Sequence, residues 1–346
     1  MEQFVEKVNN LLKDAGFTTF TFEFKSSRES YCYDLLVKKP QSNLVFIVKI
    51  FANIDNIHED IITGIKTLSK LFKSRPLLIG LRNRYQKLED NTIYIREDLP
   101  IISYNTLENI LKKNLFPYVL IRRGGGVIYL DGALMKKMRE EQKISRKELS
   151  DKVGITKRTI CSYESENMRP SKEIAEKIED ILESNSNLFR NINVFDWHFE
   201  FDIKERSKKE DEELSEFEEH VKNIIEDIGI TSYWYKKGQF PFEMLISSKD
   251  WKAGTERENY FYPLFSEISE VEEKLKKINL KYFKMFTKFF SKNGFLIVNN
   301  NIRIKNILSK NKIPIIKIRS LEKIDDEEEF KKLFLNSGLN KSNVLN

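Results

Sequence analysis

The sequence has few of the residues that build metal sites, disulfides or membrane spans. Its two cysteines, Cys32 and Cys161, lie far apart, and only His58, His198 and His220 accompany them among 346 residues. This set supplies neither a disulfide framework nor a Cys/His metal site. There is no run of about 20 apolar residues, and the N-terminal segment lacks the apolar stretch of a signal peptide. The sequence therefore predicts a soluble cytoplasmic protein with no membrane partner.

Several catalytic signatures are missing as well. The chain contains no G-x-S-x-G, no H-E-x-x-H and no dinucleotide-binding fingerprint. Three consecutive glycines at 124–126 lack the strand-to-helix context and the following Lys-Ser/Thr of a phosphate-binding loop, so a hairpin turn is favoured. We therefore expect no catalytic residue, no metal and no cofactor.

The residues that are present are typical of a folded protein with several domains. Hydrophobic residues make up 40% of the chain and charged residues 32%, and 25 Phe and 13 Tyr are among them. At about 100–200 residues per domain, the length predicts two or three domains. The net charge of +6 arises from 59 basic and 53 acidic residues. Because this excess is small, only a local concentration of basic residues would indicate binding to a polyanion.

The first 115 residues predict one α/β domain with a mixed sheet. Apolar residues at helical spacing lead to Gly16, three β-rich runs then predict a meander, and Asn105 is the expected cap of a last helix. The predicted elements are a helix at 4–15, strands at 18–24, 31–39 and 44–51, a helix at 58–74, strands at 76–81 and 98–104, and a helix at 105–113. A β-hairpin is predicted in the connector 116–131.

A second α/β domain is predicted at 216–335, because three segments of the first domain recur there in the same order. Residues 217–230 align with 4–17, residues 286–298 with 68–80, and residues 313–324 with 99–110, at offsets of 213, 218 and 214. The matches include Gly16 with Gly229 and Pro100 with Pro314, which helical periodicity does not require. We interpret the two regions as diverged copies of one domain. Common amphipathic patterning is the alternative.

Two further segments complete the domain organisation. Residues 186–215 are expected to connect the domains, with a strand or a pair of strands at 191–202 and an acidic linker after it. Seven carboxylates lie between Glu210 and Glu219, which is typical of a solvated linker or of the start of a helix. Residues 336–346 are expected to form a tail.

The αβββαβ order of the first domain resembles the fold of restriction endonucleases and Holliday-junction resolvases. The metal site of that fold needs an Asp at the second strand and an acid-x-Lys pair on the third. Asp34 and Lys49 match this pattern, but Ile47 stands where the second carboxylate belongs. One carboxylate is too few for a Mg²⁺ site, so an ion pair between Asp34 and Lys49 is expected. In the second domain Glu243 stands opposite Asp34 without an acid-x-Lys pair, and the resemblance implies two degenerate, non-cleaving domains.

Residues 132–185 have a purely helical period and predict a compact bundle. Ser145 and Glu148 fit a capping box, Gly154 lies at a tight turn, and Thr156 fits a cap, which is the spacing of a helix-turn-helix. The helices are expected at 133–142, 145–152, 156–165 and 171–182. The expected shared interior consists of Met135, Met138, Ile144, Leu149, Val153, Ile155, Ile160, Tyr163, Ile174, Ile178 and Ile181.

The stretch "MKKMREEQKISRKELSDKVGITKRTICSYE" and the trailing "ENMRPS" resemble the Cro and λ-repressor class of helix-turn-helix domains, also called the XRE class. Ser150 departs from that class, which usually has Ala there. The resemblance implies that the third helix faces the base edges of double-stranded DNA and that two arginines contact phosphates. The implied base-facing residues are Thr156, Lys157, Arg158 and Ser162, and the implied phosphate contacts are Arg146 and Arg169. Spacing independently places Ile160 and Tyr163 inward, and Lys157, Arg158, Cys161 and Ser162 outward.

The local charge agrees with an anionic partner. Between Lys136 and Arg158 there are nine basic and four acidic residues, a net charge of +5. Such an excess suits the neutralisation of phosphates. The alternatives are a solvated lysine-rich face and a helix-turn-helix that contacts protein.

The whole arrangement resembles a family of archaeal helix-turn-helix transcriptional regulators of about this length. The resemblance implies two degenerate endonuclease-like α/β domains flanking a DNA-binding bundle, and a non-enzymatic regulator that reads an operator sequence. A homodimer is expected because one such module buries too little surface to discriminate a genomic site. The flanking domains are expected to serve dimerisation, added DNA contact or contact with the transcription apparatus. A metal-dependent nuclease or resolvase targeted by the helix-turn-helix, and an antitoxin or ligand-sensing regulator, are the alternatives.

Overall fold

A computed structural model describes residues 1–21, 31–39, 44–123, 125–183, 188–199, 214–235, 240–248, 261–303 and 313–336. The chain divides into two compact units. Residues 1–21, 33–65 and 74–200 form the first unit, and residues 22–32, 66–73 and 201–346 form the second. Within the described ranges, no helix combines the length and the apolar character that crossing a bilayer requires.

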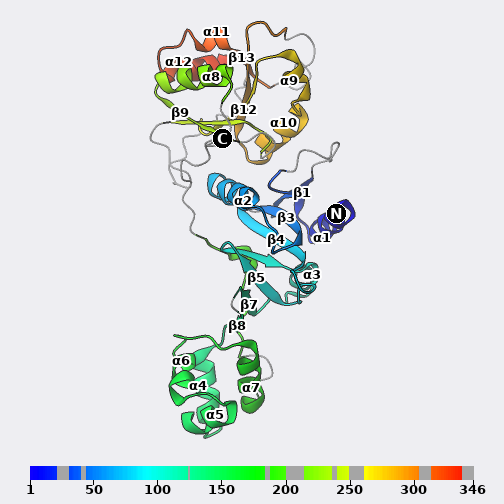
Figure 1. Ribbon diagram of the computed structural model, residues 1–346, viewed down its shortest axis with the longest axis vertical. Helices are drawn as coiled ribbons and strands as arrows, with labels where there is room; N and C mark the ends of the chain where they lie inside the picture. The colour runs from blue at the N-terminus through cyan, green and yellow to red at the C-terminus, as the bar shows by residue number, and fades with distance from the viewer. Residues whose placement is uncertain are drawn as a thin grey trace. The chain divides into compact units, whose positions relative to one another are not determined.

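The N-terminal α/β domain contains a mixed sheet of eight strands, in the order β1-β2-β3-β4-β6-β5-β7-β8 (Figure 1). Its elements are α1 (Glu2–Asp14), β1 (Thr18–Thr21), β2 (Leu35–Lys38), β3 (Val45–Asn53), α2 (Glu59–Leu71), β4 (Arg75–Arg82), β5 (Thr92–Arg96), β6 (Leu99–Ile102), α3 (Tyr104–Lys113), β7 (Val119–Arg122) and β8 (Gly125–Ile128). The antiparallel β1-β2-β3 meander that the sequence predicts is present, and β4 then pairs in parallel with β3 and β6.

One face of this sheet carries a core that α1 and α3 cover. Val8 and Leu12 of α1 and Leu107 of α3 are fully buried in a cluster with alternate residues of β3, including Phe46 and Val48. Because side chains alternate along a strand, the residues between them point to the opposite face. This alternation assigns Ile47 and Lys49 to the opposite face.

Two details of this domain differ from the sequence-based expectation. The sequence does not predict strand β5. Its only signal is the short run "TIYIR", which stands between polar residues. The cap of α3 is Ser103, not Asn105: Ser103 Oγ accepts a hydrogen bond from the Thr106 N–H at 3.0 Å. The Asn105 amide instead donates to Asp90 Oδ2 at 3.1 Å, because it already lies in the first turn of the helix.

The predicted hairpin is formed by β7 and β8, which extend the eight-stranded sheet at its edge. Gly124 of the expected turn lies outside the described residues. After β8 the chain enters a bundle of four helices, which belongs to the same unit. These helices are α4 (Gly132–Glu141), α5 (Arg146–Val153), α6 (Lys157–Glu164) and α7 (Lys172–Leu182).

Every residue that the sequence predicted for the interior of the bundle belongs to one core or packs against it. Met135, Leu149, Val153, Ile160 and Ile178 are buried there. The other expected residues are buried or packed against this core. Its further buried members, which were not expected, are Ala175, Leu182 and Leu188, and Val119, Ile128 and Leu130 from the hairpin region. Asp131 caps α4 by accepting a hydrogen bond from the Leu134 N–H at 2.9 Å. Periodicity and caps thus predicted this bundle closely.

The expected strands at 191–202 are not present among its described residues, 191–199. A 3₁₀ helix, η1 (Val194–Asp196), stands there, and the Asn193 side chain caps it by accepting a hydrogen bond from the Phe195 N–H at 3.0 Å. Buried Val194 and the ring of Phe195 pack into the core of the N-terminal sheet, so the apolar run is used without strand pairing. Residues 200–213, which include the first part of the acidic linker, lie outside the described residues.

The second unit contains a five-stranded sheet in the order β13-β12-β11-β10-β9. Its elements are α8 (Glu216–Asp227), β9 (Ile230–Trp234), β10 (Met244–Ser248), β11 (Leu264–Ser269), α9 (Glu272–Lys277), α10 (Leu280–Phe289), β12 (Asn293–Val298), β13 (Ile315–Lys317), α11 (Ile318–Leu321) and α12 (Glu327–Asn336). Residues of α8, α11 and α12 are buried together on one face of this sheet.

Five neighbouring strands of the first sheet, β1-β2-β3-β4-β6, match the strands β9-β10-β11-β12-β13 of the second in order and direction, whereas β5, β7 and β8 have no counterpart among the described strands of the second sheet. In both, the first three strands form an antiparallel meander, and the next two pair in parallel with it and with each other. The first helix of each ends before a glycine with a left-handed backbone, Gly16 with φ 85° and Gly229 with φ 82°. That backbone conformation explains why the aligned helices end at glycine.

Candidate nucleic-acid interface

The turn between α5 and α6 is built by residues with local tasks. Ser145 and Glu148 form the expected capping box at the start of α5. Gly154, with φ 81°, ends that helix, and its N–H donates to Ser150 O at 2.9 Å. Thr156 Oγ1 then accepts a hydrogen bond from the Thr159 N–H at 3.1 Å and caps α6. Each terminus therefore fixes the direction in which the next helix leaves.

Ser150, the departure from the resembled class, fits its site. The residue is buried, and its hydroxyl donates to the Lys147 carbonyl at 2.7 Å. A buried hydroxyl that is hydrogen-bonded costs little. The packing of α5 against the turn is therefore retained with Ser in this position.

The side chains of α6 divide into an inner and an outer set. Ile160 and Tyr163 are buried, whereas Thr156, Lys157, Arg158 and Cys161 are exposed and Ser162 is half-buried. Neither Lys157 nor Arg158 has an ion-pair partner among the described residues. Their charges are therefore available to an external anion.

The sequence did not reveal that a buried carboxylate joins three helices beneath this surface. Glu164, at the end of α6, lies 2.6 Å from Arg139 Nε of α4 and 2.7 Å from Arg146 Nε of α5, and its side chain is 3% exposed. Arg139 is also buried and donates to the Ile144 carbonyl at 2.9 Å. The hydrogen bond and charge of Glu164 raise the pKa of Arg146. The sequence does show ionisable residues at inward-facing helical positions. Which of them pair across the helices can be known only once the packing of the helices is known.

The two arginines assigned to phosphates are both held in place by the protein. Arg146 keeps 35% of its side chain exposed while its Nε contacts Glu164. Arg169 is exposed, and its guanidinium lies 3.6 Å from the centre of the Tyr129 ring. A stacked guanidinium keeps its N–H groups along the ring edge free to donate. Both groups are therefore partly preorganised for an anion, and α6 lies between them in the sequence.

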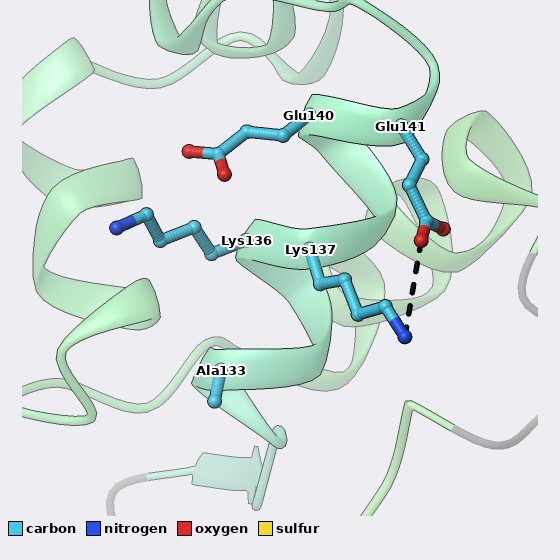
Figure 2. A pocket seen from close by; sticks show the side chains of 5 residues that line it. All are labelled: Ala133, Lys136, Lys137, Glu140 and Glu141. Atoms are coloured by element: carbon cyan, nitrogen blue, oxygen red, sulfur yellow. Dashed lines mark ion pairs between the residues drawn. The ribbon is translucent and has the colours of Figure 1, made fainter.

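The outer face of α4 differs from that of α6. A shallow hollow there is lined by Ala133, Lys136, Lys137, Glu140 and Glu141. Figure 2 shows Lys137 and Glu141 pointing toward one another, with 3.8 Å between Nζ and Oε1. Two lysines and two glutamates share this face, so the local basic excess is weaker here than on α6.

The nuclease-like site of the N-terminal domain contains an ion pair. Lys49 Nζ of β3 lies 2.9 Å from Oδ1 of Asp34, which directly precedes β2, and both residues are buried. The Ile50 N–H donates to the other carboxylate oxygen at 2.7 Å. Buried Ile47 stands beside Lys49 on the same face. The expected pairing of Asp34 with Lys49 is confirmed.

The second unit keeps a similar pair with a cation from another element. The register places Phe265 and Glu267 where β3 has Ile47 and Lys49. The Nζ of Lys274, on α9, instead lies 3.0 Å from Glu243 and 3.2 Å from Glu218. Burial alone would lower the pKa of Lys274, but these two carboxylates raise it above its usual value. No cluster of three or more His, Cys, Asp or Glu residues suited to a metal occurs in the described part of the chain.

Comparison with known proteins connects these features to families. Residues 1–117 match the PD-(D/E)XK superfamily domain, and residues 135–187 match a helix-turn-helix family. A protein of Methanobrevibacter smithii is 29% identical over 330 residues, and one of Pyrococcus abyssi is 28% identical over 330 residues, with 95% of each chain covered in both cases. Both carry the description "Putative HTH-type transcriptional regulatory protein". The chain is therefore similar over most of its length to archaeal proteins of this description.

A further protein of the same description, from Pyrococcus horikoshii, is 33% identical over 181 residues, which cover 52% of this chain and 56% of that one. No solved structure matches the chain at a comparable significance. The chain is therefore a mixed α/β protein with an N-terminal PD-(D/E)XK domain and a helix-turn-helix domain after it, as the sequence predicted.

Proposed function

We propose that the chain is a non-enzymatic transcriptional regulator that reads a specific DNA sequence with a helix-turn-helix of the Cro and λ-repressor class. One observation carries this proposal: α6 presents Thr156, Lys157 and Arg158 to solvent while its opposite side is fixed by Ile160 and by the Glu164 ion pairs. A rigid helix with free donors is what readout of base edges needs. The match of residues 135–187 to a helix-turn-helix family supports the same function.

In this proposal Thr156, Lys157, Arg158 and Ser162 face base edges. Arg146 and Arg169 donate to phosphates on either side of the groove. Arg contacts to phosphate give affinity without sequence information, whereas Arg158 can donate two hydrogen bonds to guanine and thereby selects a base. The half-buried Ser162 contributes through its hydroxyl only if the helix enters the groove deeply.

We expect a homodimer because the DNA-contacting surface of one helix-turn-helix is small. One helix-turn-helix module contacts a half-site, and genomic specificity requires a second one about one helical turn away. We propose that the two α/β domains arose as copies of one domain, which their common strand order supports. They would then serve dimerisation, further contact with DNA, or contact with the transcription apparatus.

The two cysteines provide a direct test of the orientation of α6. Cys161 is exposed on its outer face, whereas Cys32 is 2% exposed, so a maleimide should react with Cys161 selectively. A preferred duplex is first selected from a random pool. We expect alkylation of Cys161 to abolish binding to it, and bound duplex to protect Cys161 from alkylation.

The matched control is Cys161→Ser, which should bind the duplex like the wild type and be insensitive to the maleimide. An unchanged rate of alkylation in the presence of saturating duplex would contradict the placement of α6. Equal affinity of the wild type for the selected duplex and for random DNA would contradict sequence-specific binding.

A metal-dependent nuclease is the second candidate, because residues 1–117 match the PD-(D/E)XK superfamily and Asp34 and Lys49 lie together. Incubation with Mg²⁺ or Mn²⁺ and supercoiled or branched DNA tests it. Cleavage that depends on the metal and is lost in Asp34→Asn, with DNA binding retained, would establish the nuclease. The buried Lys49–Asp34 pair and the Ile at position 47 favour the non-enzymatic function.

A further inference from the structure

A basic loop of the N-terminal domain exposes an aromatic ring to solvent. Residues 82–87, with the sequence Arg-Asn-Arg-Tyr-Gln-Lys, begin at the last residue of β4, and we call them the 82–87 loop. Tyr85 is 86% exposed, the highest value among the exposed large hydrophobic residues described. Arg82, Arg84 and Lys87 are also exposed. Packing within the domain does not account for a large ring in this position.

The 82–87 loop is held rigidly by its own hydrogen bonds. Arg82 and Lys87 form an antiparallel bridge, and the Asn83 N–H donates to the Gln86 carbonyl at 2.9 Å. Asn83 Oδ1 accepts from the N–H groups of Tyr85 and Gln86 at 2.8 and 2.7 Å. These bonds define an Asx-type turn that fixes the backbone under Tyr85. The ring therefore projects from a preorganised support.

A carboxylate clamps the loop to the domain. Asp55 Oδ2 accepts from the Arg84 N–H at 2.9 Å, and Oδ1 accepts from Arg96 Nε at 2.8 Å. Although burial would raise the pKa of Asp55, its bonds to Arg84 and Arg96 hold that pKa below the usual value. Asp55 therefore remains charged at neutral pH and keeps the loop in place without contacting the exposed side chains.

In the described part of the chain, the cations of the 82–87 loop have no ion-pair partner. Among the described residues, Arg84 and Lys87 form no ion pair, and Arg82 Nε donates only to the Asn83 carbonyl at 3.3 Å. The nearest following carboxylate, Glu89, is engaged by the Gln86 amide and by Lys172. Three cations surround the exposed Tyr85 ring. This arrangement suits a polyanion whose charged groups are separated by sugars or planar bases, because the cations can bind the charges and the ring can pack between them.

A contact links this region to the helix-turn-helix within the same unit. Lys172 Nζ, at the start of α7, lies 3.5 Å from Glu89 Oε2, two residues beyond Lys87. Arg169, the proposed phosphate contact, lies three residues before Lys172. The loop and the helix-turn-helix are thus connected by a direct contact between segments that adjoin their basic residues.

We propose that the 82–87 loop is a second DNA-contacting surface, which binds duplex DNA flanking the half-site that α6 reads. This inference rests on the proposed function. Arg84 and Lys87 bind phosphates of the flanking segment, and Tyr85 packs against the sugars at the edge of the minor groove. Phosphate contacts from a second surface extend the footprint and raise affinity without adding base readout.

The test compares two duplexes, the selected half-site alone and the same half-site extended by about one helical turn on each side. Affinity is measured by fluorescence anisotropy between about 50 and 200 mM salt. On the extended duplex, Arg84→Ala/Lys87→Ala should reduce the salt slope by about two, because each phosphate contact contributes about 0.9. Tyr85→Ala should weaken binding several-fold at unchanged slope. On the short duplex both variants should bind like the wild type.

The matched control is Lys13→Ala/Lys113→Ala, which removes two exposed lysines of the same unit and should leave both slopes unchanged. Circular dichroism verifies folding, which surface substitutions should preserve. Loop variants that match the wild type on the extended duplex would overturn the second surface while leaving readout by α6 intact. A loss of affinity equal to that of the lysine control would overturn it too. A wild type without preference for the half-site would instead refute the proposed function itself.

Discussion

The Nζ atom of Lys49 lies 2.9 Å from Oδ1 of Asp34, and the two side chains are 10% and 8% exposed. Removal of one partner leaves the other charged and buried, at a cost of ~3–5 kcal/mol. Lys49→Met should therefore lower the free energy of unfolding by about this amount, measured by urea denaturation. The double variant Asp34→Asn/Lys49→Met should lose clearly less than the sum of the single losses. Additive losses would show that the two groups do not stabilise each other.

Glu164 is expected to stabilise the packing of α6 against α4 and α5 through its ion pairs with Arg139 and Arg146. Glu164→Gln leaves Arg139 and Arg146 without their shared carboxylate, and should destabilise the bundle by about 3 kcal/mol. Hydrogen exchange followed by mass spectrometry should show faster exchange in α4, α5 and α6 of the full chain. Glu173→Gln, which removes an exposed pair with Lys177, is the control and should cost less than about 1 kcal/mol. Equal effects of the two substitutions would contradict a stabilising role of Glu164.

Gly132 allows α4 to approach α6 closely. A Cβ atom at this position would lie 2.5 Å from the Glu164 carbonyl oxygen and 2.6 Å from that of Tyr163. Gly132→Ala should therefore force α6 to move, at a cost of ~1–3 kcal/mol, and weaken DNA binding. Gly154→Ala meets no atom within 4 Å, so it should cost only the ~1–2 kcal/mol of a left-handed backbone. Retention of full DNA affinity in Gly132→Ala would contradict the close approach.

Substitutions of the proposed contacts should separate base readout from phosphate binding. Arg158→Ala should cost ~1–3 kcal/mol of binding free energy and relax base preference, whereas Arg169→Ala should weaken all sequences alike and lower the salt slope by about one. Arg146→Ala should do the same as Arg169→Ala and also speed hydrogen exchange, because Arg146 pairs with Glu164. A change of base preference in Arg169→Ala would contradict this division. Lys137→Ala on the mixed face of α4 is the control.

The pH dependence of the second unit should follow Lys274. Its pKa is raised above 10.5 in the folded chain, so its ion pairs stabilise the fold fully below that pH. The stabilisation is lost as pH rises through the folded-state pKa. In urea denaturation, the stability difference between wild type and Lys274→Met should stay constant from neutral pH to about pH 10 and shrink at higher pH. A difference that disappears below pH 9 would contradict the raised pKa.

Local signals in the sequence predicted the parts of the structure that depend on neighbouring residues. Ser145 with Glu148, Gly154 and Thr156 each act within one turn of chain, so their spacing is sufficient to assign their tasks. The cap of α3 was misassigned because Ser103 and Asn105 are both good caps, and only the pairing of β6 decides where the helix begins.

Interactions between distant segments could not be predicted in the same way. Glu164 contacts Arg139, 25 positions earlier in the chain, and its selection among many glutamates depends on how α4 and α6 pack. The 82–87 loop has a recognisable composition, but its rigidity depends on Asp55, which the fold brings to the Arg84 amide. Asp34 with Lys49 was predictable only because a known motif already joins those two positions.

The Lys274–Glu243 pair affects how relatives of this chain should be compared. When the two sheets are aligned by strand register, Glu267 of the second domain stands where the first domain has Lys49, so a sequence comparison would score the motif as absent. The acidic group before β10 nevertheless keeps a cation at 3.0 Å, supplied by a helix that follows β11. A buried carboxylate is costly unless a cation pairs with it, and that cation can come from any segment of the chain that lies close enough. A motif search that fixes the position of the cation in the sequence will therefore miss such a pair, whereas a search for a buried carboxylate with a cation nearby in space will find it.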